Sequence, residues 1–157
     1  MERNKIITEL QKYFKIEELV SPKVYETYGE ANWRLFSTEI LETALVLRCK
    51  ILNVPLICNN WKGGGQLTQR GFRENISSIV WSKTNAGVLY MGAHTIGKGL
   101  DFSSGKMTAD EMRAVIKAKQ SLLPHKVRIE LPKSAPTWLH IDTMTAPDQR
   151  EKICWFA

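Results

Sequence analysis

KVRIELPKSAPTWLHID, residues 126–142, is the stretch that decides the expected fold. Its two ends, 127–131 and 138–142, alternate apolar and polar residues with a period of two, which is typical of half-buried strands. The residues between them, 132–137, include two prolines and a serine and favour a turn. We therefore expect an antiparallel hairpin near the C-terminus.

Helical spacing of apolar residues precedes this hairpin in three places. We expect helices over residues 4–19, ended by Ser21-Pro22, over 38–52, with Ser37 as the N-cap, and over 108–123. The third begins with a capping box, Thr108 to Glu111, and ends before a proline. Helices combined with a small antiparallel sheet predict an α+β fold in a single domain.

Three other segments complete the expected organisation. The apolar run 54–58 is bounded by turn residues and predicts a short buried strand, and residues 153–156 predict a last strand. Between them, residues 59–75 are rich in glycine and polar residues and predict a long loop of the kind that carries function.

Composition narrows the classes of function. The chain has 157 residues and 43% hydrophobic residues, enough for one core. Its net charge of +6 comes from basic residues spread along the chain, and without a basic stripe we expect no nucleic-acid partner. A basic nucleic-acid-binding module is kept as an alternative from outside the hydrolases.

Cysteines and apolar runs bear on the compartment. The three cysteines lack metal-ligand spacing and are expected to be reduced core residues. The N-terminus has no apolar signal region, and no stretch has the length of a membrane span. We expect synthesis in the cytoplasm without a signal peptide, and no membrane insertion.

Two histidines and one aspartate form a candidate metal site. His140 shares the polar face of its strand with Trp138 and Asp142, because strand side chains alternate. His94 and Asp101 flank glycines that allow the chain to fold back. Two imidazoles and one carboxylate are a ligand set that leaves zinc one open position. Each residue alone is also compatible with a surface or turn position, as we expect for the remaining histidine, His125.

The spacing His94-x-x-Gly97-x-Gly99-x-Asp101, followed by Trp138-x-His140-x-Asp142, resembles the S-x-H-x-x-G-x-A-x-D and W-x-H signature of the zinc D-Ala-D-Ala carboxypeptidase and L-alanyl-D-glutamate peptidase family. The resemblance covers about residues 35–157 and includes the loop NNWKGGGQLTQRGFR, residues 59–73. It implies a hedgehog/DD-peptidase-like fold, with a zinc peptidase domain over 35–157 and residues 1–34 as a docked helical extension. Glycines at 92 and 99 replace the signature serine and alanine, which are small-for-small changes.

The resemblance also implies roles for individual residues. His94, Asp101 and His140 would ligate one Zn²⁺ per chain. Arg73 would hold the oxyanion, because a guanidinium stabilises charge that develops on an amide oxygen, and Arg70 in the same loop is the competitor.

The general base departs from the family pattern. Many relatives carry an Asp or Glu three residues before the second histidine, where this chain has Thr137. Glu130 is the first candidate for the base, because a hairpin that pairs it opposite His140 brings it to the metal. Asp142 is the second candidate, although an acid two residues beyond a ligand more naturally orients the imidazole.

The expected function is therefore hydrolysis of an amide bond in peptidoglycan stem peptides, as a phage endolysin or a DD-carboxypeptidase. Trp61 and Trp138 are candidates for lining the substrate groove. We expect a monomer that reaches the cell wall after release during phage lysis or by delivery in a virion. The alternative is a catalytically incompetent relative that binds the wall or has a structural role in the virion, and Thr137 is the reason to keep it.

Overall fold

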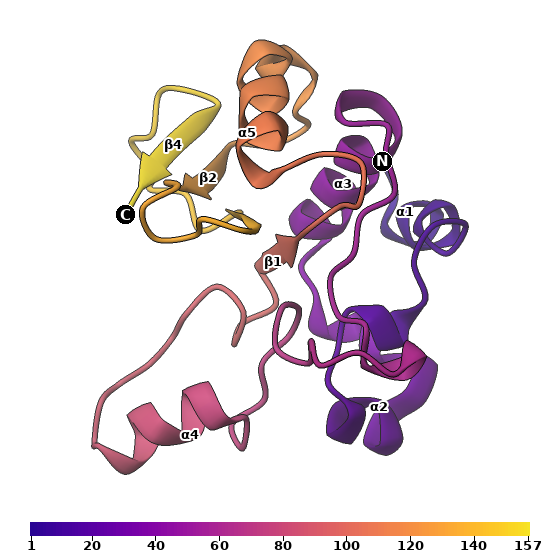
Figure 1. Ribbon diagram of the computed structural model, residues 1–157, viewed down its shortest axis with the longest axis vertical. Coiled ribbons are helices and arrows are strands. Elements are labelled where there is room, and N and C mark those ends of the chain that lie inside the picture. Colours follow the sequence, from indigo (N-terminus) through magenta and orange to yellow (C-terminus); the bar gives the residue numbers. More distant parts are fainter.

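The computed structural model describes all 157 residues and combines five α-helices with one four-stranded sheet (Figure 1). The α+β class and the single domain are confirmed. The α-helices are α1 (Arg3–Leu10), α2 (Pro22–Tyr28), α3 (Thr38–Val46), α4 (Ser78–Asn85) and α5 (Ala109–Ala118). The strands are β1 (Gly99–Phe102), β2 (Val127–Glu130), β3 (Leu139–Asp142) and β4 (Ile153–Phe156). Short 3₁₀ helices cover Ile16–Glu18, Gly29–Leu35, Trp61–Gly63 and Gln120–Leu122, and a π-helical turn, Leu47–Ile51, extends α3.

The sheet has the order β1-β3-β2-β4. The predicted hairpin is confirmed: β2 and β3 pair antiparallel, and β3 also pairs antiparallel with β1. The C-terminal strand β4 joins the outer edge of β2 in parallel, so the sheet is mixed and the expectation of a purely antiparallel sheet was wrong. Alternation of apolar and polar residues indicates that a segment is a strand, but it does not show which strand it pairs with or in which direction.

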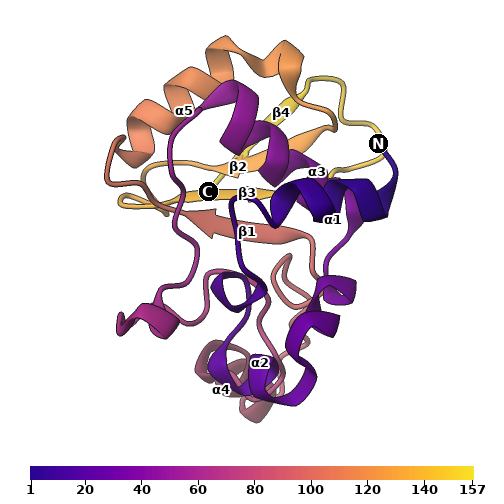
Figure 2. The same ribbon diagram turned by 90° about the vertical axis from the view of Figure 1, so that its right-hand side faces the viewer.

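Helices cover one face of the sheet, and polar residues occupy the other. α3 and α5 lie over the sheet in Figure 2, and α1 packs against α3. Leu100, Phe102 and Ile141 point into this layer and are fully buried. Because side chains alternate, the intervening residues of β1 and β3 point to the opposite face, where the candidate site lies.

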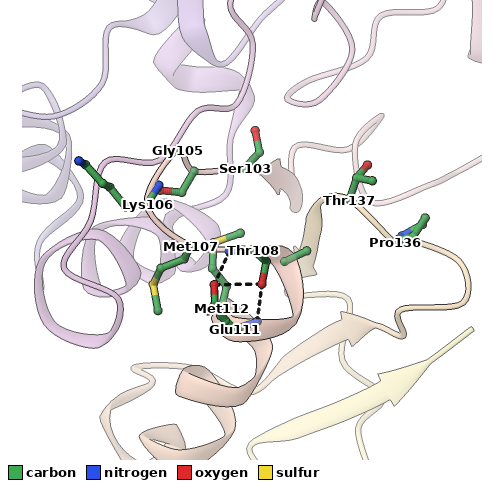
Figure 3. A pocket seen from close by; sticks show the side chains of 11 residues that line it. Ser103, Gly105, Lys106, Met107, Thr108, Glu111, Met112, Pro136 and Thr137 are labelled. Carbon is green, nitrogen blue, oxygen red and sulfur yellow. Dashed lines mark hydrogen bonds between the residues drawn. The ribbon is translucent and has the colours of Figure 1, made fainter.

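Local signals placed the expected helix starts correctly and one helix end incorrectly. Ser37 caps α3 by accepting a hydrogen bond from the Ile40 amide at 3.2 Å. The capping box of α5 forms as predicted between Thr108 and Glu111 (Figure 3). The expected helix over 4–19 ends at Leu10, and the Ser21-Pro22 pair begins α2 instead of ending a helix. Proline is favoured at the first helical position, where its missing N–H is not needed.

Other segments differ from expectation in smaller ways. Residues 54–58 form only one isolated bridge, between Ile57 and Ser103, and not a strand. The loop 59–75 is irregular as predicted, apart from the short 3₁₀ turn. α5 ends at Ala118, short of the predicted residue 123. Within residues 1–34, Ile6 and Leu10 are fully buried in the same core cluster as the strands.

Residues 74–92 form an excursion that contains α4, here called the α4 arm, and it was not expected from the sequence. The arm projects away from the sheet in Figure 1. Residues 81–89 are all exposed. No helix in the chain has both the length and the apolar character needed to cross a bilayer.

Candidate metal centre

The sheet brings Asp101 and His140 together. They are direct cross-strand partners in the antiparallel pair of β1 and β3, so their side chains lie on the same face. His94 comes from the turn just before β1, which closes through a 2.8 Å bond from the Lys98 amide to the Ala93 carbonyl. All three residues are buried and could hold a metal ion together.

The turn that presents His94 depends on Gly97. This residue has a φ of 68°, and a Cβ atom there would lie 1.8 Å from the carbonyl oxygen of Leu35. Any side chain at this position meets both a strained backbone and a collision with main chain. The sequence-based idea that glycine allows the chain to fold back is confirmed at this position.

The three candidate ligand atoms all lie within 4.8 Å of one another. His94 Nε2 lies 3.2 Å from His140 Nδ1 and 3.3 Å from Asp101 Oδ1, and the last two atoms are 2.7 Å apart. Ligands bound at about 2.0–2.1 Å in a tetrahedral zinc site are about 3.3 Å from one another. Two of the three separations match this value. The third is a hydrogen-bond distance and would have to lengthen by about half an ångström.

Both imidazoles are oriented by hydrogen bonds at their other nitrogen. The Nδ1 atom of His94 lies 2.7 Å from the carbonyl oxygen of Gly71. A carbonyl can only accept, so Nδ1 carries the proton and the lone pair of Nε2 faces the other two ligands. The Nε2–H of His140 donates to Asp142 Oδ2 at 3.0 Å, which leaves Nδ1 to face the site.

Asp142 is held in place by more than His140. Its cross-strand partner Arg128 donates to both carboxylate oxygens, at 2.8 and 2.9 Å, and the Met144 amide donates to Oδ1 at 2.9 Å. The side chain of Asp142 is fully buried. With its oxygens occupied by these donors, Asp142 fixes the orientation of the His140 ring.

Charges around His140 and Asp101 stabilise their charged forms in the metal-free protein. Burial lowers the pKa of His140, but hydrogen bonds to Asp101 and Asp142 outweigh it and raise the pKa to about 9. Burial likewise raises the pKa of Asp101, but its hydrogen bonds with His140 and His94 hold that pKa well below its usual range. A metal ion therefore has to displace a proton from His140 at neutral pH.

A cleft of about 330 Å³ opens onto the three ligands. Its lining comes from loop 59–75, from the α4 arm and the turn that follows it, and from the strands and the residue before β3. The lining residues are Arg73, Tyr90, Gly92, Ala93, His94, Asp101, Arg128, Glu130, Trp138, His140, Asp142 and Phe156. The cleft therefore adds two carboxylates, two guanidinium groups and aromatic side chains to the candidate ligand cluster.

The two arginines of loop 59–73 are separated by the structure. Arg73 lines the cleft, and its Nη2 donates to Asp101 Oδ2 at 3.2 Å. Arg70 instead bonds Ser103 Oγ at 2.9 Å and does not line the cleft.

The tryptophans separate in the same way. Trp138 lines the metal cleft and is half-buried. Trp61 donates its indole N–H to the carbonyl of Val20 at 2.9 Å and lies outside the cleft. The structure therefore does not bring Trp61 to the cleft with Trp138. His125 also lies elsewhere, paired with Glu42 at 2.8 Å.

Both candidates for the base, Glu130 and Asp142, line the metal cleft, whereas Thr137, at the position where the relatives carry the acid, lines a different cavity. Glu130 lines the metal cleft, and the register of β2 and β3, continued by one residue, aligns it with His140. Thr137 lines a separate cavity beside the start of α5 (Figure 3), which shares no residue with the metal cleft.

Four cleft residues were not identified from the sequence: Tyr90, Ala93, Arg128 and Phe156. The alternation along β2 could have identified Arg128, because Arg128 shares the polar face of this strand with Glu130 and pairs with Asp142. Phe156 packs edge-on against His140, with ring centres 5.7 Å apart, and beneath the Arg128 guanidinium. Phe156 and Tyr90 carry no local signal, since their places depend on the parallel β4 strand and on the α4 arm.

Comparison of the chain with protein-family models, with curated proteins and with solved structures gave no match.

Proposed function

We propose that the protein is a zinc-dependent peptidase that hydrolyses an amide bond in peptidoglycan stem peptides. One observation carries the catalytic part of this proposal: three atoms that could ligate a metal ion lie close together in the lining of a cleft that also holds Glu130 and Arg73. The resemblance of the His94–Asp101 and Trp138–Asp142 motifs to the zinc carboxypeptidase and endolysin family supports the choice of cell-wall peptide.

The ligands and their partners fit a catalytic zinc site. His94, Asp101 and His140 would hold the ion, and three protein ligands leave a position for water. When bound, zinc supplies a Lewis acid and lowers the pKa of its water toward neutrality. Asp142 and Gly71 keep the two imidazoles turned toward the ion.

Glu130 is assigned the role of general base. It is the one carboxylate of the cleft that makes no side-chain hydrogen bond within the protein, since Asp101 and Asp142 are both engaged. Glu130 accepts a proton from the attacking water and passes it to the leaving amine. It replaces the acid that Thr137 cannot provide.

Arg73 is assigned the stabilisation of the oxyanion. Its Nε donates to the Gln69 carbonyl at 2.6 Å and its Nη2 to Asp101, so the guanidinium is held in one orientation. Nη1 makes no hydrogen bond within the protein and is available to the substrate carbonyl. A fixed cation at this point stabilises negative charge as it develops on that oxygen.

The same proposal gives the biological context. The enzyme acts as a monomer on the cell wall, which it reaches by release during phage lysis or by delivery in a virion.

The test combines metal analysis with digestion of purified sacculi. Wild-type protein should bind one zinc and release new amino termini. Glu130→Gln should bind zinc equally and release them about 10²–10⁴-fold more slowly. Glu26→Gln, a change of an exposed glutamate outside the cleft, is the matched control and should behave as wild type.

Two outcomes would contradict the proposal. Bound zinc with no new amino termini from wild-type protein would favour the inactive, wall-binding or structural relative. Full activity of Glu130→Gln would refute the assignment of the base.

A further inference from the structure

Residues 88–92 of the α4 arm run extended beside the metal cleft with their backbone groups unused. The Val88 amide still donates to the Lys83 carbonyl at 2.9 Å, and the Gly92 carbonyl accepts from the Thr95 amide at 3.0 Å. Between these points, none of the amides of 89–92 and none of the carbonyls of 88–91 makes a hydrogen bond within the protein. The segment therefore has a free edge of donors and acceptors.

This free edge leads directly to the ligands. Tyr90 and Gly92 line the metal cleft, whereas the alternating residues Leu89 and Met91 are 89% and 61% exposed. Over residues 89–92 this alternation is that of an extended strand. The segment contains no charged residue.

Arg73, just before the α4 arm, contacts two residues of the candidate metal site. The Arg73 amide donates to the His94 carbonyl at 3.2 Å, which ties the start of the arm to its end. Arg73 also contacts Asp101, so the free edge is joined to both the metal ligands and the oxyanion residue. A peptide held along the edge is thereby placed relative to the reacting groups.

We propose that residues 88–92 are the main-chain docking edge for the substrate, which lies extended beside them and exchanges backbone hydrogen bonds with them. This inference rests on the proposed peptidase function and specifies its substrate. Peptides that add a strand to a free edge gain affinity from main-chain bonds. An uncharged edge suits a peptide with small apolar side chains, such as alanine.

The length of the edge selects among substrates. Five extended residues span about 16 Å, which a peptide of four or five residues can follow and a dipeptide cannot. The edge therefore favours cleavage within a longer stem peptide over recognition of a terminal D-alanyl-D-alanine unit alone.

Hydrogen exchange on zinc-loaded Glu130→Gln tests the inference without turnover. The probes are a synthetic pentapeptide, L-Ala-γ-D-Glu-L-Lys-D-Ala-D-Ala, and the dipeptide D-Ala-D-Ala. The pentapeptide should slow exchange of the amides of Leu89 and Met91, which an extended segment presents on the same edge, at least about tenfold, and the dipeptide should not.

The outcomes separate this inference from the proposed function. Pentapeptide binding measured by calorimetry without protection of Leu89 and Met91 would overturn the docking edge alone. Equal protection by the dipeptide would overturn the length selection. Protection without peptide that rises with protein concentration would mean that a second copy of the chain covers the edge. Failure of both peptides to bind would overturn the proposed substrate and this inference with it.

A pair of substitutions distinguishes backbone from side-chain contacts. Met91→Pro removes one free amide and suits an extended segment. In the Glu130→Gln background it should weaken pentapeptide binding about tenfold, with zinc content unchanged. Met91→Ala keeps the amide and should weaken binding less. Equal weakening by both would show that the side chain, and not the backbone, contacts the peptide, and would refute the inference.

Discussion

Asp142→Asn tests whether the buried carboxylate behind His140 prepares the site for zinc. In the native chain, one oxygen of Asp142 accepts from His140 Nε2 and Arg128 Nη2, and the other accepts from Arg128 Nε and the Met144 amide. Asparagine has nearly the same shape but offers one oxygen and one NH₂ group to these donors. At least one donor is then left facing another donor inside a buried site.

The expected magnitude follows from two opposing effects. Loss of the partner that orients a ligating histidine costs about 10–100-fold in metal affinity, or about 1.4–2.7 kcal/mol. The same substitution removes one of the two carboxylates that raise the pKa of His140 to about 9, so protons compete less with zinc at neutral pH. The comparison is therefore made at pH 9, where that competition is small and the orientation effect dominates.

The assay is a competition titration of zinc against a chelator, with circular dichroism to check the fold. Asp110→Asn is the matched control, because Asp110 also pairs with an arginine, Arg113, at 2.9 Å, but is exposed and outside the cleft. The control should bind zinc as wild type. Folded Asp142→Asn protein whose zinc affinity at pH 9 stays within about twofold of wild type would refute the orienting role.

Three further predictions follow. Because the pKa of His140 is raised to about 9, its imidazole keeps a proton below about pH 9 that zinc has to displace. The apparent zinc affinity of the wild type should therefore rise nearly tenfold per pH unit between pH 7 and 9 and then level off. A flat pH profile in a chelator competition would contradict this. Gly97→Ala should lower the free energy of unfolding by at least about 2 kcal/mol, measured in urea, because φ is 68° and the new Cβ would meet Leu35 O; an unchanged midpoint would contradict it. Leu10→Ala should cost about 2–5 kcal/mol, since Leu10 is fully buried; a melting temperature equal to wild type would show that α1 is not part of the core.

Short-range patterns in the sequence were sufficient for much of the fold. The alternation in 127–131 and 138–142 predicted the hairpin, and Thr108 with Glu111 predicted the start of α5, because each signal involves residues only a few positions apart. The prediction of a helix end at Ser21-Pro22 was wrong, because the same two residues can follow one helix or begin the next, depending on what packs around them.

Half of the candidate site was predictable for the same reason. Alternation along β3 places His140 and Asp142 on one polar face, and the glycine at 97 indicates a tight turn beside His94. The choice of Arg73 over Arg70 was not decided by sequence, since both lie in one irregular loop and differ only in which distant residue they contact, Asp101 or Ser103.

The sequence by itself determined the hairpin, the capped helices and the residue types of a candidate metal site, because these depend on neighbours within a few positions of the chain. Only the tertiary structure decided that β4 runs parallel to β2 and brings Phe156 to His140. It also decided that Thr137 lines another cavity while Glu130 lines the metal cleft, and that the α4 arm leads to this cleft. Those contacts join residues tens of positions apart. Their geometry is set by strand order and packing, to which no local pattern of residues corresponds.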